Sequence, residues 1–196
     1  IIAIALAIFT FSTGAYDYWK EEGFIRRLSE TIEFLHQQAI IDQAFYRLEF
    51  NLKDNTYKVG VLRPEQDYDQ TLIKAAQDAG TLSLELAAYL NPSLSGAQTL
   101  IAPPSFPSLA KPVALPPGAK IEDIRTMRGK KTPTESQKAF IFFSPRGFSE
   151  FAVIHLTMRR GNKFTILINP FTGLTEVLPE YKDYEWTYGR NKKAAG

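Results

Sequence analysis

The first 63 residues contain no proline, and this absence constrains the fold more than any other feature of the chain. Proline breaks helices, so nothing forces a helix to end before about residue 44. Between residues 24 and 45, apolar side chains recur three and four positions apart, which places them on one helix face. The members of this stripe are Ile25, Leu28, Ile32, Leu35 and Ala39. We therefore predict one helix over residues 1–45, whose part from 24 to 45 packs on a folded head.

The start of that helix, residues 1–16, carries no charged side chain. Its large apolar residues are Ile1, Ile2, Ile4, Leu6, Ile8, Phe9 and Phe11. A signal peptide would need a basic region and a small-residue cleavage site, which this stretch lacks, whereas a short core helix stays open as an alternative. The stretch rises about 24 Å as a helix, against a hydrocarbon layer of about 30 Å. Because the chain also starts without an initiator methionine, we expect the lower part of a longer membrane helix.

The hydrophobic period changes to two after the helix, which indicates strands. Tyr46, Leu48 and Phe50 alternate with polar residues, and a turn at 53–55 leads to a second strand, so a β-hairpin is predicted. The segment 63–118 includes a proline-dense stretch, for which we expect an extended connection without regular structure.

Short apolar segments separated by turns follow the proline-dense stretch, and they predict an antiparallel meander. The residues expected to form the turns are Pro145, Gly147, Pro170 and Gly173. The predicted fold class is therefore α+β, with a long, partly transmembrane N-terminal helix packed on an antiparallel β-sheet or sandwich. The head spans 46–180, and a polar, basic tail spans 181–196.

The residue types present argue against most catalytic chemistry. The chain has no cysteine, which excludes disulfides, thiolate metal sites and a cysteine nucleophile. A hydrolase would need Ser144 or Ser149 beside His155, but no strand–turn–helix elbow surrounds either serine. We therefore predict a non-enzymatic protein without a cofactor.

A short acidic segment offers one candidate metal site. Glu65, Asp67 and Asp69 alternate along the chain, and their carboxylates could bind calcium. The glycine and the terminal glutamate of an EF-hand loop are missing, so a solvated turn is the favoured interpretation.

The order of these segments resembles that of type IV pilins and pseudopilins. Three stretches carry the closer likeness to the H-type minor pseudopilins of type II secretion: LPPGAKIEDI, FIFFSPRGFSEFAVIHL and FTILINPFTGLTEVL. The likeness covers about residues 1–62 and 115–180. The chain departs from that family in two respects: it lacks the expected N-terminal Phe with a Glu at the fifth position, and its insert at 63–118 is long.

The resemblance implies a structural subunit of a secretion pseudopilus, involved in protein export across the outer membrane. It implies a single-pass protein of the bacterial inner membrane with its head in the periplasm. The implied partners are other pseudopilins, major and minor, and the inner membrane, with a secreted substrate or the outer-membrane channel as further candidates. No metal or cofactor is implied.

A second interpretation concerns the basic C-terminal tail. Some minor pilins of DNA uptake hold phosphates with a basic C-terminal tail of this kind, and Arg190, Lys192 and Lys193 could contact DNA here. The aromatic residues Tyr184, Trp186 and Tyr188 could stack on bases. Nucleic acid is a partner only under this alternative, and a solubilising tail is the commoner role of such a segment.

Overall fold

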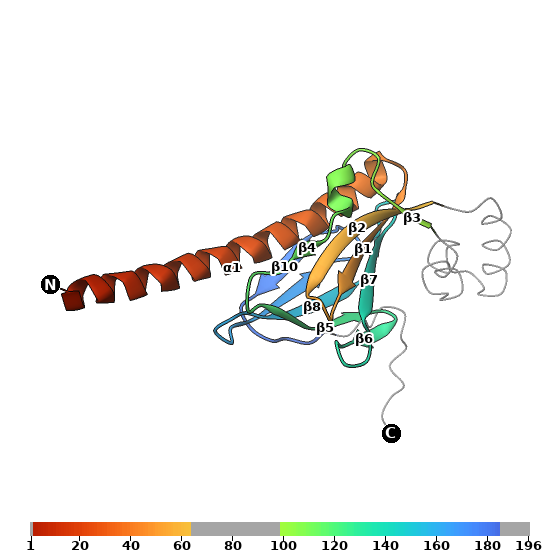
Figure 1. The fold of residues 1–196 in the computed structure, drawn as a ribbon. Helices are drawn as coiled ribbons and strands as arrows, with labels where there is room; N and C mark the ends of the chain where they lie inside the picture. Colours follow the sequence, from red (N-terminus) through yellow and green to blue (C-terminus); the bar gives the residue numbers. More distant parts are fainter. Residues whose placement is uncertain (1, 64–98, 185–196) are drawn as a thin grey trace, which may run out of the picture.

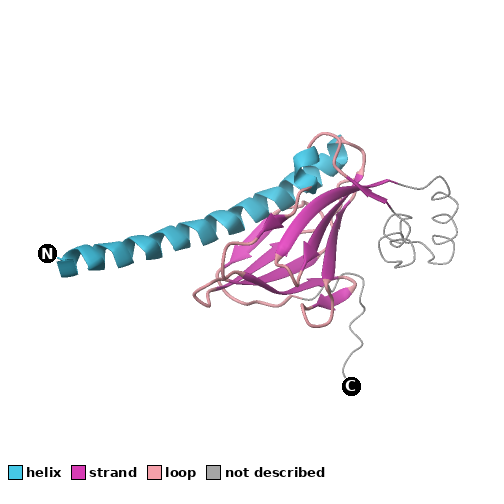
Figure 2. Cartoon of the chain, viewed as in Figure 1, coloured by secondary structure: helices cyan, strands magenta, loops and turns pink. Residues whose placement is uncertain are grey.

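The computed structural model of the chain describes residues 2–63 and 99–184, with side chains described from residue 20 onward. A single helix, α1 (Ile2–Ile41), spans 40 residues. Its C-terminal half lies against a β-rich head, and its N-terminal half projects from that head (Figure 1). Figure 2 shows that strands make up most of the head. The predicted α+β class is confirmed, with two antiparallel sheets beside one long helix.

The helix ends in a hydrogen-bonded C-cap rather than at a proline or glycine. Gln43 adopts the left-handed conformation, with φ +49°. Its N–H donates to the carbonyl of Ile40 at 3.3 Å, and the N–H of Ala44 donates to the carbonyl of Ala39 at 3.1 Å. These are the two bonds of a Schellman motif, which satisfies carbonyls that the last helical turn leaves unpaired. The helix consequently ends at Ile41, whereas the sequence pattern placed its end at residue 45.

The first sheet has the strand order β3-β2-β1-β7, with β4 also paired to β2. Its strands are β1 (Phe45–Asn51), β2 (Thr56–Arg63), β3 (Thr99–Ile101), β4 (Val113–Ala114) and β7 (Lys138–Phe143). The second sheet has the order β10-β9-β8-β5-β6. Its strands are β5 (Lys120–Thr126), β6 (Gly129–Lys131), β8 (Ala152–Thr157), β9 (Lys163–Ile168) and β10 (Thr175–Leu178).

The predicted meander is wrong at β7. This strand pairs with β1 in the first sheet, where Ile141 lies opposite Leu48 and Phe143 opposite Tyr46. The next strand, β8, pairs with β5 and β9 in the second sheet. Alternation shows which face of a strand is buried but not which strand lies beside it. The chain therefore changes sheets between Phe143 and Ala152.

The proline-dense segment, expected to be irregular, and the connection between β5 and β7 both contain short regular elements. The proline-dense segment forms β3, a 3-10 helix η1 (Pro107–Ala110) and β4. Proline is tolerated there because Pro107 begins the 3-10 helix and the strands lie at the margin of the sheet. Between β5 and β7, Gly129 has φ +109° and opens β6, which pairs with β5.

One continuous apolar core joins the helix to both sheets. Tyr46, Leu48 and Phe50 point into it from β1, and Ile154 and Leu156 from β8. The helix contributes a buried stripe that consists of Phe24, Ile25, Leu28, Ile32, Leu35 and Ala39. Each fully buried aliphatic side chain in such a core stabilises the fold by about 1.5–3 kcal/mol relative to leaving it in water.

Within the described residues, no helical stretch combines the length and the apolar character needed to cross a membrane.

Candidate interaction surfaces

The helix stripe predicted to contact the head lies at the helix–head interface. Ile25 is only 4% exposed to solvent, and the other four predicted residues are completely buried. Their contacts lie within the chain, so this stripe is not itself a surface for a partner. Because this stripe faces the head, the helix residues on the two flanks of the stripe face away from the core.

The two predicted glycine-bearing turns lie side by side, although 25 or so residues separate them in sequence. In the first turn the Ser144 N–H donates to the carbonyl of Phe148 at 2.7 Å, and in the second the Asn169 N–H donates to that of Leu174 at 2.9 Å. The N–H of Ser149 donates to the carbonyl of Pro170 at 2.8 Å and joins the turns. Gly147 and Gly173 have φ of +80° and +69°, a region that favours glycine.

Both turns are held against one flank of α1. Nδ1 of His36 hydrogen-bonds to Oγ of Ser149 at 2.7 Å, in a buried contact. The N–H of Thr175 donates to Oε1 of Glu33 at 3.0 Å, and the Thr175 hydroxyl also contacts the Ser29 hydroxyl. His36 is therefore buried and holds the turns against the helix.

The joined turns carry three exposed apolar side chains: Phe148, Phe171 and Leu174. We call these three residues, together with the neighbouring Glu176 of β10, the ridge. The three apolar residues are 50%, 53% and 57% exposed. The two phenylalanine rings meet edge to face, with centroids 6.2 Å apart. Glu176 lies two positions after Leu174, in β10, and is also exposed. Grouped exposed apolar side chains of this kind mark sites where proteins associate.

A groove of about 840 Å³ lies along α1 beside β2 and the β4 segment. Its floor is apolar and includes the buried residues Phe24, Tyr57 and Leu115. Lys20 and Arg27 line it from the helix, and Val113 lines it from β4. The ridge, with its exposed apolar side chains, and this groove, with its apolar floor, are our two candidate surfaces for a partner.

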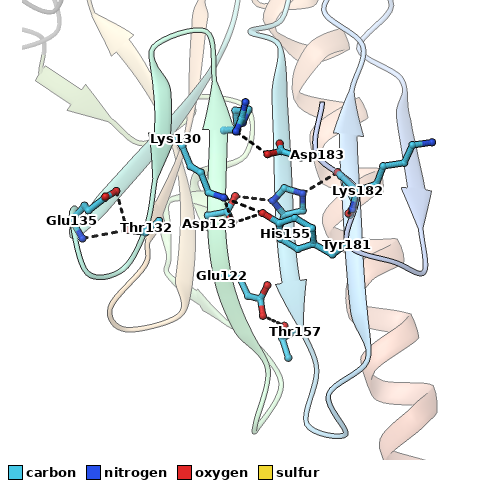
Figure 3. Close-up of polar contacts among 12 residues, drawn as sticks. Glu122, Asp123, Lys130, Thr132, Glu135, His155, Thr157, Tyr181, Lys182 and Asp183 are labelled. Atoms are coloured by element: carbon cyan, nitrogen blue, oxygen red, sulfur yellow. Dashed lines mark hydrogen bonds and ion pairs between the residues drawn. The ribbon is translucent and has the colours of Figure 1, made fainter. Parts of the chain in front are cut away.

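His155 is the centre of a polar cluster on the outer face of the second sheet (Figure 3). Its Nδ1 lies 2.7 Å from Oδ1 of Asp123, and its Nε2 lies 3.0 Å from the carbonyl oxygen of Lys182. Both partners are acceptors, so the ring donates from both nitrogens and is an imidazolium beside an ionised carboxylate. Oδ2 of Asp123 pairs with Nζ of Lys130 at 3.1 Å and accepts a hydrogen bond from the Tyr181 hydroxyl, also at 3.1 Å.

This cluster fastens the segment after β10 to the sheet. The Tyr181 ring stacks on His155 with centroids 3.9 Å apart. The Thr165 hydroxyl donates to the carbonyl of Glu180 at 2.7 Å and accepts from the N–H of Lys182 at 2.9 Å. Arg125 pairs with Asp183 at 2.7 Å on the same face. The arrangement therefore has a structural role: it covers the outer face of β8 and β9.

Asp123 and His155 are expected to make the stability depend on pH. Burial acts to lower the pKa of His155, but its hydrogen bonds to Asp123 and to the Lys182 carbonyl raise that pKa above its ordinary value. The stabilisation is then complete below about pH 6.5, the ordinary histidine pKa, and is lost as pH rises through the folded pKa. Burial acts to raise the pKa of Asp123, but its hydrogen bonds lower it overall. Its contribution is lost only in acid, as pH falls through that depressed pKa.

Urea unfolding between about pH 5.5 and 9 measures this effect. The wild-type chain should lose more stability across that range than His155→Gln, which keeps a donor but cannot be protonated there. Equal pH dependence of the two chains would contradict the imidazolium assignment.

The serine–histidine–aspartate arrangement considered from the sequence is not formed in the described part of the chain. Ser149 pairs with His36, and the Ser144 hydroxyl accepts from the N–H of Arg146 at 3.2 Å. His155 instead contacts Asp123 and the Lys182 carbonyl. The three groups that a nucleophilic mechanism needs are thus divided between two separate sites.

Several predicted residues lie outside the described part of the chain. They are the side chains from Ile1 to Phe11, the acidic residues Glu65, Asp67 and Asp69, and the basic residues Arg190, Lys192 and Lys193. Their roles stay predictions. Among the described residues, no group of three or more histidine and acidic side chains is arranged to hold a metal ion.

No family model matches the chain, and no curated protein matches its sequence. Among solved structures, it is similar to the minor pseudopilin EpsH from the Type 2 Secretion System of Vibrio cholerae, with 9% sequence identity and a TM-score of 0.51. The match covers 84% of this chain and 99% of the EpsH chain. The chain therefore has a type II secretion pseudopilin-like fold, as the order of its sequence segments indicated.

Proposed function

We propose that the chain is an H-type minor pseudopilin, a non-enzymatic structural subunit of a type II secretion pseudopilus that takes part in protein export across the outer membrane. The observation that carries the proposal is the arrangement of α1. One face of its C-terminal half is buried on a β-rich head, while its N-terminal half extends beyond that head (Figure 1). The fold similarity to EpsH, which covers 84% of this chain, supports the proposal.

The physical role follows from the two parts of the helix. The uncharged residues 1–16 are proposed to lie in the bacterial inner membrane before assembly and against neighbouring apolar helices in the filament afterwards. The head would then stand in the periplasm, where it contacts other pseudopilins. A secreted substrate or the outer-membrane channel is a further proposed contact of the head.

Deletion of the gene in the bacterium that encodes the chain tests this proposal. We expect proteins that depend on type II secretion to accumulate in the periplasm, and we expect the unaltered gene to restore their release. The protein itself should fractionate with the inner membrane. A loss of DNA uptake with normal secretion would favour the alternative that rests on Arg190, Lys192 and Lys193.

The absence of cysteine gives this test a direct structural readout. A single cysteine placed at Ile41, which is highly exposed at the end of α1, reports contacts from that position alone. We expect it to crosslink to a pilin-like subunit of the same secretion system. Two results together would reject the proposed function: normal secretion in the deletion strain, and no crosslink from the Ile41→Cys variant in cells that make it.

A further inference from the structure

We infer that the groove between α1 and the β4 segment receives an α-helix of a neighbouring, different pseudopilin, with apolar side chains on the floor and an acidic side chain beside Arg27. The inference rests on the proposed function, because it names the surface through which one filament subunit would hold the helix of another. The two walls of the groove are α1 and the segment from Leu109 to Pro117.

The wall formed by α1 has the residue spacing of a helix-packing surface. Apart from Glu30, its lining residues follow one another at intervals of four, three, four and three positions: Lys20, Phe24, Arg27, Thr31 and Phe34. This alternation keeps side chains on one line along a helix, the line against which a second helix packs in a coiled coil. From Phe24 to Phe34 the line is about 15 Å long, which matches roughly three turns of a partner helix.

The opposite wall is apolar and open to solvent. Val113, Ala114 and Pro117 are exposed there. Between the walls, the buried residues Phe24 and Tyr57 contribute to an apolar floor. Exposed apolar side chains gathered around a recess mark a site for a protein partner. The exposed wall belongs to the 63–118 segment, whose length sets this chain apart from the family that it resembles.

The β4 segment is poorly suited to bind an added strand. The strand has two residues, Val113–Ala114, and it lies between Pro112 and the pair Pro116 and Pro117. Proline has no N–H, so this segment offers few donors to a strand that would extend the sheet. An α-helix pairs its own backbone groups and needs only side-chain contacts to lie in a groove. The occupant that fits both walls is therefore a helix.

Arg27 gives the groove a positive charge with which no described carboxylate forms an ion pair. Its side chain is exposed, and it lies close enough to Tyr57 to act against the burial that raises the pKa of that hydroxyl. The groove carboxylate, Glu30, is already paired with Arg26 at 2.8 Å, and Lys20 already has a partner. An acidic side chain on the incoming helix is therefore the complement of Arg27.

The position of the groove points to a different pseudopilin. Lys20, its first helix residue, comes four positions after the uncharged stretch 1–16, which is proposed to pack with neighbouring helices. A helix that runs along that stretch would continue into the groove where α1 joins the head (Figure 1). A second copy fits less well. Its residues 1–16 contain no carboxylate to lie beside Arg27, and its apolar stripe from Ile25 to Ala39 is buried on its own head.

Photo-crosslinking of the full-length chain, in the bacterium that encodes it, tests the inference. A photo-reactive phenylalanine analogue replaces Thr31 on the helix wall in one variant and Val113 on the opposite wall in another. Irradiation should join both variants to the same helical segment of one different pseudopilin, identified by mass spectrometry of the joined peptides. The analogue at Glu22, which is exposed on α1 but does not line the groove, is the matched control and should give little of that product.

Charge reversal supplies the second arm of the test. In the Val113 variant, Arg27→Glu should lower the yield of the crosslinked product about fivefold, which corresponds to roughly 1 kcal/mol. Arg27→Lys keeps the charge and should retain most of the yield. Lys131→Glu is the control for the change in net charge, because Lys131 is exposed on β6 in the second sheet and does not line the groove.

Products with a second copy or with an exported protein, or no product from either wall, would overturn the inference, and so would a yield that Arg27→Glu leaves unchanged. If these results occur while deletion of the gene still blocks secretion, only this inference falls. If secretion is normal in the deletion strain, the proposed function falls as well.

Discussion

Replacement of Gly173 with alanine is expected to lower the free energy of unfolding by about 2–5 kcal/mol. Gly173 has φ +69°, where a residue with a Cβ is less stable by about 1–2 kcal/mol. A Cβ at this position would also lie 2.1 Å from Cγ and 2.5 Å from Cβ of His36. His36 would have to move, and its buried hydrogen bond to Ser149 would be disturbed. Crowding of this kind adds about 1–3 kcal/mol.

Gly161→Ala is the matched control for that variant. Gly161 has φ +81°, but nothing lies within 4 Å of the position a Cβ would take. Its replacement should therefore show only the conformational part, about 1–2 kcal/mol. Urea unfolding of the two variants measures the difference. Equal destabilisation would mean that the contact between Gly173 and His36 contributes nothing.

The helix and its buried stripe could be predicted because their signals are local. Residues spaced three and four apart, such as Ile25, Leu28 and Ile32, reveal a helix face without any knowledge of what it contacts. The end of the helix was harder to place. Gln43 occupies the left-handed position of the C-cap, where glycine is usual, so the common signal for a stop was missing.

The pairing of strands depends on contacts that no local pattern records. The segment Lys138–Phe143 has the alternation of any half-buried strand, and nothing in it indicates β1 as its neighbour. His155 and Asp123 are likewise 32 residues apart, and their pairing follows only from the register of β5 and β8. His36 and Ser149 lie 113 residues apart.

The ridge was missed for a related reason. The turns at 144–148 and 169–174 were each recognisable from proline and glycine, but their sequences do not show that they adjoin. The two exposed phenylalanines that follow Gly147 and Pro170 were the available signal, because an apolar side chain in a turn has no local reason to be there.

Leu28→Ala and Leu35→Ala are each expected to lower the free energy of unfolding by about 2–5 kcal/mol. Both side chains are completely buried between α1 and the sheets. They are seven residues apart, about 10 Å along the helix, so their effects should nearly add. The double variant would then lose about 4–10 kcal/mol, against a typical total of 5–15 kcal/mol for a domain.

Ile41→Ala is the control for these two variants, because Ile41 is 71% exposed and its replacement should change stability by no more than about 0.5 kcal/mol. Urea unfolding measures all four chains. Costs below about 1 kcal/mol for both leucine variants would contradict the packing of α1 on the head.

In the cell, the same variants distinguish the role of residues 1–16 from the role of the buried stripe. Residues 1–16 are unchanged in Leu28→Ala, so membrane association should persist if that stretch is the anchor. Secretion should nevertheless fall, because the stripe that holds the head at a fixed position on α1 is weakened. A filament subunit needs both properties at once: its helix must pack with neighbouring helices, and its head must keep its surfaces in register with theirs. Membrane association with reduced secretion is therefore the result that a rigid helix–head junction predicts.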